Sequence, residues 1–438
     1  MPGLSCAGNP NYREVKMVNT KAYEVVFVSA FEYPVKTSLV YSQLIRQALY
    51  FKNRDVFKEV HYLGIVSTVS KIKGILLRKP YNLDYIYQLG LKSKIIFAFM
   101  FMATFRLGLD KLVFVPKSKI INYICKKIFI NWKELKEKKV IFICRSYIAT
   151  HAAIALRERM KHKSEIRIVF DMRSIFSNEL PFFKKSYKRV LSLYGYAKTW
   201  EDYLISKSDI TIITTSRAKE YLELENPQRN IKKINIQGLG KKNILNVEAV
   251  FKKRWTNKKI AYVGTVGHWN STDVLDKVFE KIHELIPEAH LEVASQNYRG
   301  KYPCHVIDHH EIDNYYEGLL AIIVPGMLPM NYFENSKISY NFFSTKVAEA
   351  LSRGVPIISN KIILELYELI KEKQCGILFG VGENGKIDID SSAGLNNQNY
   401  WREITNNAMM LRQEYFAENI FEEYIKTAID ICEGIWAN

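Results

Sequence analysis

Long apolar runs are absent from this sequence of 438 residues, and the longest strongly apolar stretch covers only residues 95–105. A membrane-spanning helix needs about 20 consecutive apolar residues, so this stretch is expected to be either a core helix or a segment at a membrane interface. The first 20 residues are polar and lack the apolar core of a secretory signal. The sequence therefore predicts no secretion.

Cysteines are few, and their spacing gives no disulfide or zinc pattern. The six are Cys6, Cys125, Cys144, Cys304, Cys375 and Cys432, with no Cys-x-x-Cys pair among them. Several lie in apolar runs, which indicates buried reduced thiols in a cytoplasmic protein. The expected location is the cytoplasm, either free or peripheral on the cytoplasmic face of a membrane.

Strong metal motifs and triphosphate-binding loops are also missing. The run 304–311 contains Cys, Asp, His and Glu, but neighbouring side chains of an extended chain point in opposite directions and cannot share one ion. Asp388 and Asp390 have the spacing of a metal-binding pair, yet they lie in a Gly-, Asn- and Ser-rich stretch that predicts a surface turn. There is no Walker loop and no Gly-x-Ser-x-Gly elbow. We expect no metal and no required cofactor.

Positive charge is concentrated in one region. Residues 61–140 carry sixteen Lys and Arg against four acidic residues, a net charge of +12 out of +18 for the whole chain. The bases of 71–139 alternate with Ile, Leu, Phe, Tyr and Trp, a mixture that suits an anionic membrane surface. The alternative is that the apolar residues form core and the lysines are simply solvated. Binding to nucleic acid is suggested by charge alone, and no nucleic-acid module is recognisable.

Strand-like and helix-like runs alternate along the chain, which indicates parallel sheets with helical crossovers. The pattern restarts after a polar stretch at 230–257, so two doubly wound domains are expected. The predicted strands are 23–28, 140–144, 166–170, 209–214, 259–263, 291–295, 320–325 and 355–359. The predicted divisions are a loosely ordered 1–21, Rossmann-like domains at 22–240 and 255–400, and C-terminal helices at 401–438 that pack back toward the first domain.

The segment 343–360 carries the most chemical information. Ser344 or Thr345 can cap a helix that Gly354 ends, directly before a strand. The amino end of that helix offers unpaired N–H groups for a diphosphate, and Lys346 adds a charge. One turn further, the carboxylate of Glu349 can accept two hydrogen bonds from a ribose diol. The alternative is a well-capped helix with only a structural role.

This segment resembles the donor-binding signature of GT-B glycosyltransferases, particularly the large retaining group called family 4. The match consists of Thr345, Lys346, Glu349, Gly354 and Pro356 in order, and the similarity extends over residues 259–360. The implied fold is α/β GT-B, with two Rossmann-like domains facing a cleft.

The resemblance also implies roles for individual residues. Glu349 would hold the donor ribose, and Ser344, Thr345 and Lys346 would meet the diphosphate. The loop after the first strand of the second domain would approach the donor through Gly264, Thr265 and Gly267. Two positions depart from the family pattern: Asn341 stands where a Glu is common, and His268 lies where an Arg and a Lys usually grip the diphosphate.

In the first half, two polar pairs follow predicted strands, where a cleft ligand would bind. Arg145 and Ser146 are candidates for binding the acceptor. Asp171 and Arg173 are candidate catalytic residues, with Asp171 orienting or deprotonating the acceptor hydroxyl and Arg173 meeting a phosphate. The alternative for Asp171 is a structural ion pair with Arg173 or Arg145.

The predicted function is transfer of a sugar from a nucleotide-sugar donor to a lipid-linked or polysaccharide acceptor, with retention of configuration. A retaining transfer needs no side-chain base, since the departing phosphate oxygen can take the acceptor proton. The first alternative is a sugar-nucleotide 2-epimerase, which shares this architecture. The second is a basic nucleic-acid-binding protein. No nucleic-acid partner is expected under the leading hypothesis.

Overall fold

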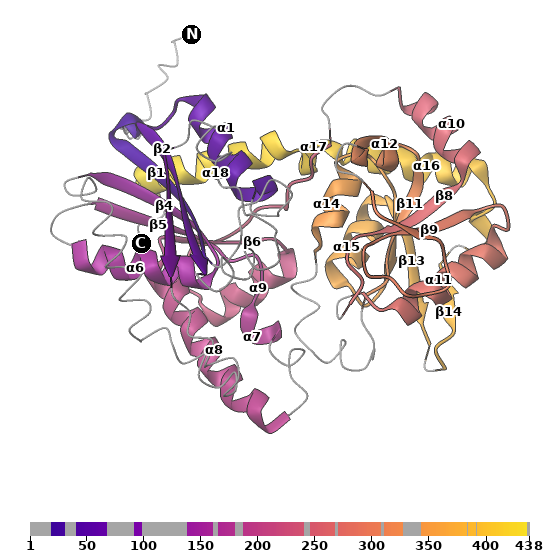
Figure 1. Cartoon of the computed structure of the whole chain (residues 1–438), viewed down its shortest axis with the longest axis horizontal. Coiled ribbons are helices and arrows are strands. Elements are labelled where there is room, and N and C mark those ends of the chain that lie inside the picture. Colours follow the sequence, from indigo (N-terminus) through magenta and orange to yellow (C-terminus); the bar gives the residue numbers. More distant parts are fainter. Residues whose placement is uncertain are drawn as a thin grey trace, which may run out of the picture.

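The computed structural model describes residues 19–30, 41–67, 92–98, 138–160, 165–179, 187–240, 246–267, 270–307, 311–326, 343–382, 384–390 and 392–435. Over these residues the chain forms two lobes, each built on a seven-stranded sheet flanked by helices (Figure 1). The first sheet is made by the first half of the chain and the second sheet by the second half. The predicted α/β class with two parallel sheets is confirmed.

The first sheet is parallel, with the strand order β3-β2-β1-β4-β5-β6-β7 over the described residues. The order reverses between β1 and β4, and such a switch point leaves a crevice at the carboxyl ends of the strands. The strands are β1 (Tyr23–Ala30), β2 (Glu59–Ser67), β3 (Lys92–Ala98), β4 (Lys139–Arg145), β5 (Glu165–Asp171), β6 (Ile210–Ile213) and β7 (Ile231–Lys233).

The second sheet repeats this plan with the order β10-β9-β8-β11-β12-β13-β14. Its pairs are parallel except for the final hairpin of β13 and β14. The switch point lies between β8 and β11, beside the glycine loop that follows β8. The strands are β8 (Lys259–Val263), β9 (His290–Ala294), β10 (Cys304–His305), β11 (Leu319–Val324), β12 (Ile357–Asn360), β13 (Gly376–Val381) and β14 (Ile387–Ile389).

Helices connect most of these strands. In the first half they are η1 (Thr20–Ala22), η2 (Tyr41–Ile45), α1 (Arg46–Arg54), α6 (Tyr147–Met160), α7 (Phe176–Glu179), α8 (Tyr187–Lys207) and α9 (Ser216–Glu225). In the second half they are α10 (Val247–Asn257), α11 (Thr272–Leu285), α12 (Ile312–Glu317), α14 (Thr345–Leu351), α15 (Leu364–Lys373), η7 (Ser392–Gly394), α16 (Gln398–Met410), α17 (Arg412–Tyr415) and α18 (Ala417–Cys432). None of the described helices is long and apolar enough to span a bilayer.

The C-terminal helix α18 crosses back to the first lobe, where it runs beside α1 (Figure 1). Its apolar face joins the core formed by β1, β2 and β4, through residues such as Ile420 and Ile431. Tyr50 of α1 packs against Phe421 with ring centroids 5.5 Å apart and donates a hydrogen bond to Glu422 at 2.6 Å. The last helix therefore belongs to the core of the first lobe.

Several local predictions were wrong. Residues 95–98 form part of strand β3 and not a helix, because they extend the first sheet beside β2; residues 99–105 lie outside the described part. Asp388 lies within β14, a strand and not a turn, and Asp390 after it pairs with Lys361.

The C-terminal helical stretch is broken into three helices. Of the described cysteines, Cys304 is exposed. The predicted loose segment 1–21 lies largely outside the described residues.

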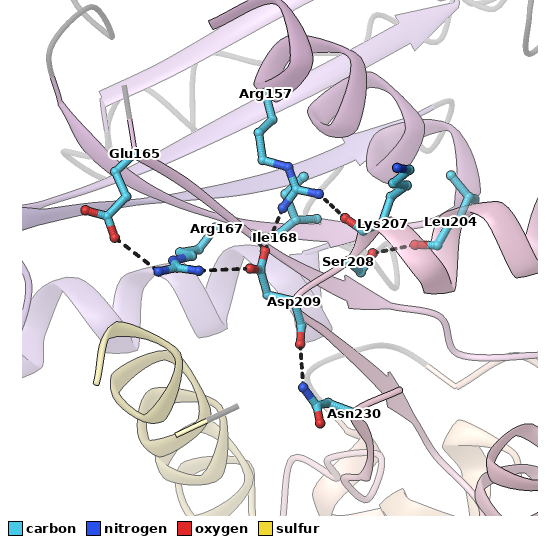
Figure 2. Close-up of polar contacts among 9 residues, drawn as sticks. All are labelled: Arg157, Glu165, Arg167, Ile168, Leu204, Lys207, Ser208, Asp209 and Asn230. Atoms are coloured by element: carbon cyan, nitrogen blue, oxygen red, sulfur yellow. Dashed lines mark hydrogen bonds and ion pairs between the residues drawn. The ribbon is translucent and has the colours of Figure 1, made fainter. Parts of the chain in front are cut away.

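Charged groups far from the cleft brace the first sheet at the amino ends of its strands. Asp209, just before β6, accepts hydrogen bonds from Arg157 at 2.9 Å and from Arg167 at 3.3 Å (Figure 2). Its carboxylate also accepts the backbone N–H of Ile168 at 2.7 Å, and its carbonyl accepts from Asn230. One residue thus ties together α6, β5, β6 and the turn before β7, at the edge opposite the carboxyl ends of the strands.

A fully buried arginine supports the second lobe. Arg254 of α10 donates to the backbone carbonyls of Glu317, Arg353 and Gly354, so its guanidinium fixes the turn between α14 and β12. Burial lowers the pKa of Arg254 to about 9, because desolvation penalises the charged form. Arg412 of α17 adds a hydrogen bond to the carbonyl of Ser352 at 3.2 Å. The guanidinium groups of Arg254 and Arg412 therefore donate hydrogen bonds to backbone carbonyls at the carboxyl end of α14. The amino end of the same helix is the predicted donor site.

Replacing Arg254 by Met should lower the free energy of unfolding by about 3 kcal/mol or more, since three buried carbonyls would lose their donors. Urea denaturation monitored by circular dichroism measures this change. Arg299→Met, at an exposed position, is the matched control and should change stability by no more than about 0.5 kcal/mol. Equal stability of the two variants would contradict a supporting role for Arg254.

Candidate functional site

The predicted donor-binding residues of two separate elements meet between β8 and α14. The Lys346 ammonium donates a hydrogen bond to the Tyr262 hydroxyl at 2.7 Å and lies 4.2 Å from the centroid of that ring. Tyr262 in turn donates to the carbonyl of Thr265 at 2.6 Å. Gly264 has φ of +121°, and a Cβ there would lie 3.4 Å from the Lys346 side chain. The glycine loop and the lysine therefore lie side by side.

The charge state of Lys346 is sensitive to what binds beside it. Burial lowers the pKa of Lys346 to about 7, because desolvation disfavours the ammonium. Among the described residues it contacts a neutral hydroxyl and an aromatic ring, and no carboxylate of these residues pairs with it. An anion bound here would restore the charge by direct attraction.

Ser344 is placed at the N-cap of α14 with extended backbone, as predicted, but its side chain does not cap the helix. Its hydroxyl oxygen is buried and makes no hydrogen bond with the described part of the chain. Because buried polar groups are nearly always satisfied, this oxygen indicates a missing polar partner at the amino end of the helix. Of the other predicted donor residues, Gly267 and Thr265 are exposed, while His268 and Asn341 lie outside the described residues.

Glu349 lies at the junction of the two lobes. Its Oε2 atom accepts the backbone N–H of Leu239 at 3.0 Å and a charged hydrogen bond from Arg353 at 2.5 Å. Arg353 is also held by Asp313 at 2.6 Å. The side-chain hydrogen bonds that Glu349 makes with described residues all go to Oε2. The carboxylate is thus oriented on one side by Leu239, which lies in the linker between the two lobes (residues 238–240). Its Oε1 atom remains available to a ligand.

The linker between the lobes packs directly on α14. A Cβ at Gly238 would lie 2.2 Å from the Ala348 carbonyl oxygen, and one at Gly240 would lie 2.2 Å from the Ser352 carbonyl oxygen. Only glycine permits this approach of backbone to backbone. The N–H of Gly240 donates to the Ser352 hydroxyl at 3.0 Å. The linker therefore sets the position of the helix that carries Lys346 and Glu349.

The candidate residues of the first lobe lie on neighbouring strands. Arg145 ends β4 and is the register partner of Asp171, which ends β5. Asp171 is fully buried, and both of its oxygens lie within 2.9 Å of the Arg173 Nε atom. Ser146 has φ of +92° and begins the turn into α6; its hydroxyl is buried and makes no hydrogen bond with described residues. The structure thus brings all four together at the carboxyl edge.

A glutamine links this edge to the donor helix. The Arg145 guanidinium donates to Gln43 Oε1 at 2.5 Å, and Gln43 Nε2 donates to the Thr345 hydroxyl at 3.3 Å. Gln43 belongs to the turn η2 and is buried. The two predicted half-sites, acceptor and donor, therefore face each other across a chain of two hydrogen bonds.

A buried carboxyl supports the loop after Asp171. Glu201 Oε1 lies 2.7 Å from the Tyr147 hydroxyl, and that hydroxyl also lies 2.9 Å from the carbonyl of Ser174 and accepts the N–H of Phe176. The same carboxyl accepts the N–H of Ser177 at 2.9 Å and the Ser177 hydroxyl at 2.5 Å. Burial raises the pKa of Glu201, because desolvation penalises the charged form more than these hydrogen bonds stabilise it.

Sequence reasoning missed Gln43, Tyr262, Arg353 and Tyr424. Tyr262 and Tyr424 look like ordinary apolar positions of a strand and a helix, and their roles come from hydroxyl groups that meet residues distant in sequence. Of these four residues, only Arg353 could have been found from the sequence. It lies in the segment 343–360 and stands four residues after Glu349, on the same helical face. Gln43 has no local sequence pattern that indicates a role.

No protein-family model matches the sequence, and no curated protein is similar to it. Solved structures match its fold. Sucrose-phosphate synthase from Thermosynechococcus elongatus has a TM-score of 0.59 at 12% identity, covering 93% of this chain and 99% of that one. UGT2 of Phytolacca americana, complexed with UDP-2fluoro-glucose and pterostilbene, has a TM-score of 0.53 at 10% identity, covering 94% and 99%.

A protein from Listeria monocytogenes assigned as a UDP-N-acetylglucosamine 2-epimerase also matches, with a TM-score of 0.50 at 14% identity, covering 93% of this chain and 95% of that one. At these identities the likeness shows the fold. The predicted GT-B architecture is confirmed, and the resemblance to GT-B glycosyltransferases holds at the level of structure.

Replacing Glu201 by Gln should remove a pH-dependent loss of stability. A carboxyl whose folded pKa is raised above the unfolded value of 4.5 binds more protons in the folded state, so the wild type loses up to about 1.4 kcal/mol per pH unit above pH 4.5 until the folded pKa is reached. Glutamine imitates the protonated carboxyl and should flatten this part of the curve. Denaturant unfolding between about pH 4.5 and 8 measures the difference.

The control for this experiment is Glu158→Gln, an exposed carboxylate of α6. It should keep the wild-type slope. If Glu201→Gln keeps that slope as well, burial does not raise the pKa of Glu201 in the folded protein.

Proposed function

We propose that this protein is a glycosyltransferase that takes a sugar from a nucleotide-sugar donor bound mainly by its second lobe. The observation that carries the proposal is the meeting of Lys346, Gly264 and the buried, unsatisfied Ser344 hydroxyl at the amino end of α14. These three features suit a diphosphate at the amino end of a helix. The lysine supplies a positive charge, the glycine lets the backbone come close, and the serine hydroxyl can form a hydrogen bond. The GT-B fold supports this assignment.

In this proposal Glu349 Oε1 accepts a hydrogen bond from the donor ribose. Oε2 is already held by the N–H of Leu239 and by Arg353, so the carboxylate is fixed before the ligand arrives. A carboxylate oriented in this way loses little freedom when it binds a diol. The same arrangement makes ribose binding dependent on the linker between the lobes.

The proposed chemistry is transfer with retention of configuration, as in family 4. The bond between the anomeric carbon and the diphosphate breaks, and negative charge grows on the departing phosphate oxygen. Lys346 stabilises this charge, and the departing oxygen takes the proton of the acceptor hydroxyl. Arg173 and Arg145 border the acceptor side. The proposed acceptor is a lipid-linked or polysaccharide hydroxyl, brought to the protein at an anionic membrane surface by the basic 71–139 region, most of which lies outside the described residues.

A nucleotide panel should identify the donor class. One nucleotide family, added without metal, should raise the melting temperature of the wild type by a few degrees, because a ligand that binds only the folded state stabilises it by mass action. Glu349→Gln should remove most of this shift if the carboxylate holds the ribose, since the amide keeps the volume of the side chain. Lys281→Met on the surface of α11 is the control and should keep the full shift. A wild type that no nucleotide stabilises would contradict the donor site.

Donor binding should weaken as the pH rises above 7. The phosphates of a nucleotide sugar do not titrate there, whereas Lys346, with a pKa of about 7 in the free protein, must take up a proton to pair with them. The association constant should fall by up to about tenfold per pH unit above pH 7, until the raised pKa of the complex is reached. Calorimetric titration between about pH 6 and 9 measures this slope.

Lys346→Arg provides the comparison for that titration, because arginine stays charged and should remove the slope. Lys346→Met should bind weakly at every pH. A wild-type affinity that is constant from pH 6 to 9 would contradict proton uptake by Lys346.

Product analysis separates this function from the epimerase alternative. A glycosyltransferase, given its donor without an acceptor, should slowly release free nucleoside diphosphate and sugar. An epimerase should return an intact nucleotide sugar with inverted configuration at C2, as suggested by the fold shared with the Listeria protein. Proton NMR of the incubated nucleotide sugar distinguishes the two results.

A further inference from the structure

A hydroxyl group from the C-terminal helix reaches the ion pair at the edge of the first sheet. Tyr424 of α18 donates a hydrogen bond to Asp171 Oδ1 at 3.1 Å, and its oxygen accepts one from Arg173 Nη2 at 3.4 Å. Tyr424 is 2% exposed. Burial raises the pKa of Tyr424, so the hydroxyl stays protonated and can donate at any physiological pH. Asp171, Arg173 and Tyr424 thus form one closed triad.

Only one member of this triad can meet a ligand. Asp171 has no exposed surface, and its two oxygens are occupied by the Arg173 Nε atom and the Tyr424 hydroxyl. The Arg173 side chain is 15% exposed. Arg173 is therefore the member of the triad whose side chain is most exposed, although its Nη1 atom is itself buried.

The backbone of Arg173 is held in an uncommon conformation. Its φ of +60° lies in the left-handed region, which non-glycine residues rarely adopt. The carbonyl of Arg173 accepts a hydrogen bond from the Thr214 hydroxyl at 3.3 Å, and the N–H of Met172 donates to the carbonyl of Ile212 at 2.9 Å. Such conformations persist where the surroundings fix them, and they are concentrated at functional sites. The loop is built to aim this one side chain.

The segment that carries Tyr424 also contacts the donor helix. Just before α18, the carbonyl of Tyr415 accepts the N–H of the linker residue Gly238 at 2.8 Å. Tyr415 stacks on Phe343, which leads into α14, with ring centroids 5.7 Å apart. The end of the chain therefore contacts α14 and the segment before it at one point, and the Arg173 ion pair at another.

We infer that Tyr424 is a positioning residue that acts through Asp171 to aim the Arg173 guanidinium at the phosphate of the nucleotide sugar during turnover. This inference rests on the proposed function. In this arrangement Asp171 is also a positioning residue, because its carboxylate touches Arg173 and not the substrate. An arginine binds phosphate through a planar fork, so a small change in its orientation alters the contact it makes.

Tyr424→Phe tests the inference, because it removes one oxygen and keeps the buried ring. With the nucleotide sugar that the panel identifies, kcat of donor turnover should fall by about 10- to 100-fold, as expected when a charge-stabilising group is displaced, while KM for that donor changes by no more than about twofold. The matched control is Tyr50→Phe, which removes a hydroxyl bonded to Glu422 of the same helix and should leave both constants unchanged. An unchanged kcat in Tyr424→Phe would overturn the inference.

A second measurement does not depend on the proposed function. Phenylglyoxal modifies accessible arginines, and mass spectrometry follows the modification of Arg173 itself. Arg173 should react about tenfold faster in Tyr424→Phe and in Asp171→Asn than in the wild type or in Tyr50→Phe. An equal rate in all four proteins would overturn the positioning role. If nucleotides fail to stabilise the wild type but the labelling difference appears, the donor assignment is wrong and the triad stands.

Discussion

The packing of the interdomain linker against α14 is the contact on which the rest of the site depends. Gly238 and Gly240 bring backbone within a distance that a Cβ would block, and this approach lets the N–H of Leu239 reach Glu349. The same helix carries Lys346 at its first turn, and its carbonyl end is held by Arg254 and Arg412. One short helix therefore has three neighbours with separate roles: the linker orients the carboxylate, the arginines fix the far end, and the glycine loop after β8 faces the lysine.

The two lobes are joined by different kinds of contact at different places. Near the site they meet through single polar contacts, such as Gln43 with Thr345 and Lys233 with Glu365 at 2.8 Å. Away from the site, α18 buries a whole apolar face in the core of the first lobe. Apolar burial of that size is worth several kcal/mol, whereas a single hydrogen bond contributes about 1 kcal/mol net. The stable attachment is therefore the C-terminal helix, and the polar contacts at the cleft set its detailed geometry.

The sequence predicts the large features because they follow from periodicity. Alternating strand and helix patterns gave the two sheets, and the segment from Thr345 to Pro356 located the donor helix. The sequence does not predict features that depend on distant partners. Tyr424 has the spacing of an apolar helix position, and nothing local indicates that its hydroxyl meets Asp171, 253 positions away.

Strand β3 was missed because a short apolar run fits a helix as well as a strand when its neighbours in the sheet are unknown. The Asp171–Arg173 ion pair was one of the alternatives, but the complete burial of Asp171 could be seen only in the fold.

The two lobes stabilise their candidate cations in different ways. Arg173 cannot lose its proton, so its charge is compensated permanently by the buried carboxylate of Asp171. Lys346 can lose its proton, and burial lowers its pKa to about 7, so it is held by the neutral Tyr262 hydroxyl without a carboxylate among the described residues. In the proposed function, a carboxylate beside Lys346 would compete with the diphosphate for the ammonium. Because an anion raises the charge of this lysine, its proposed stabilising effect is greatest where negative charge grows on the leaving group, which is where a transfer reaction requires it.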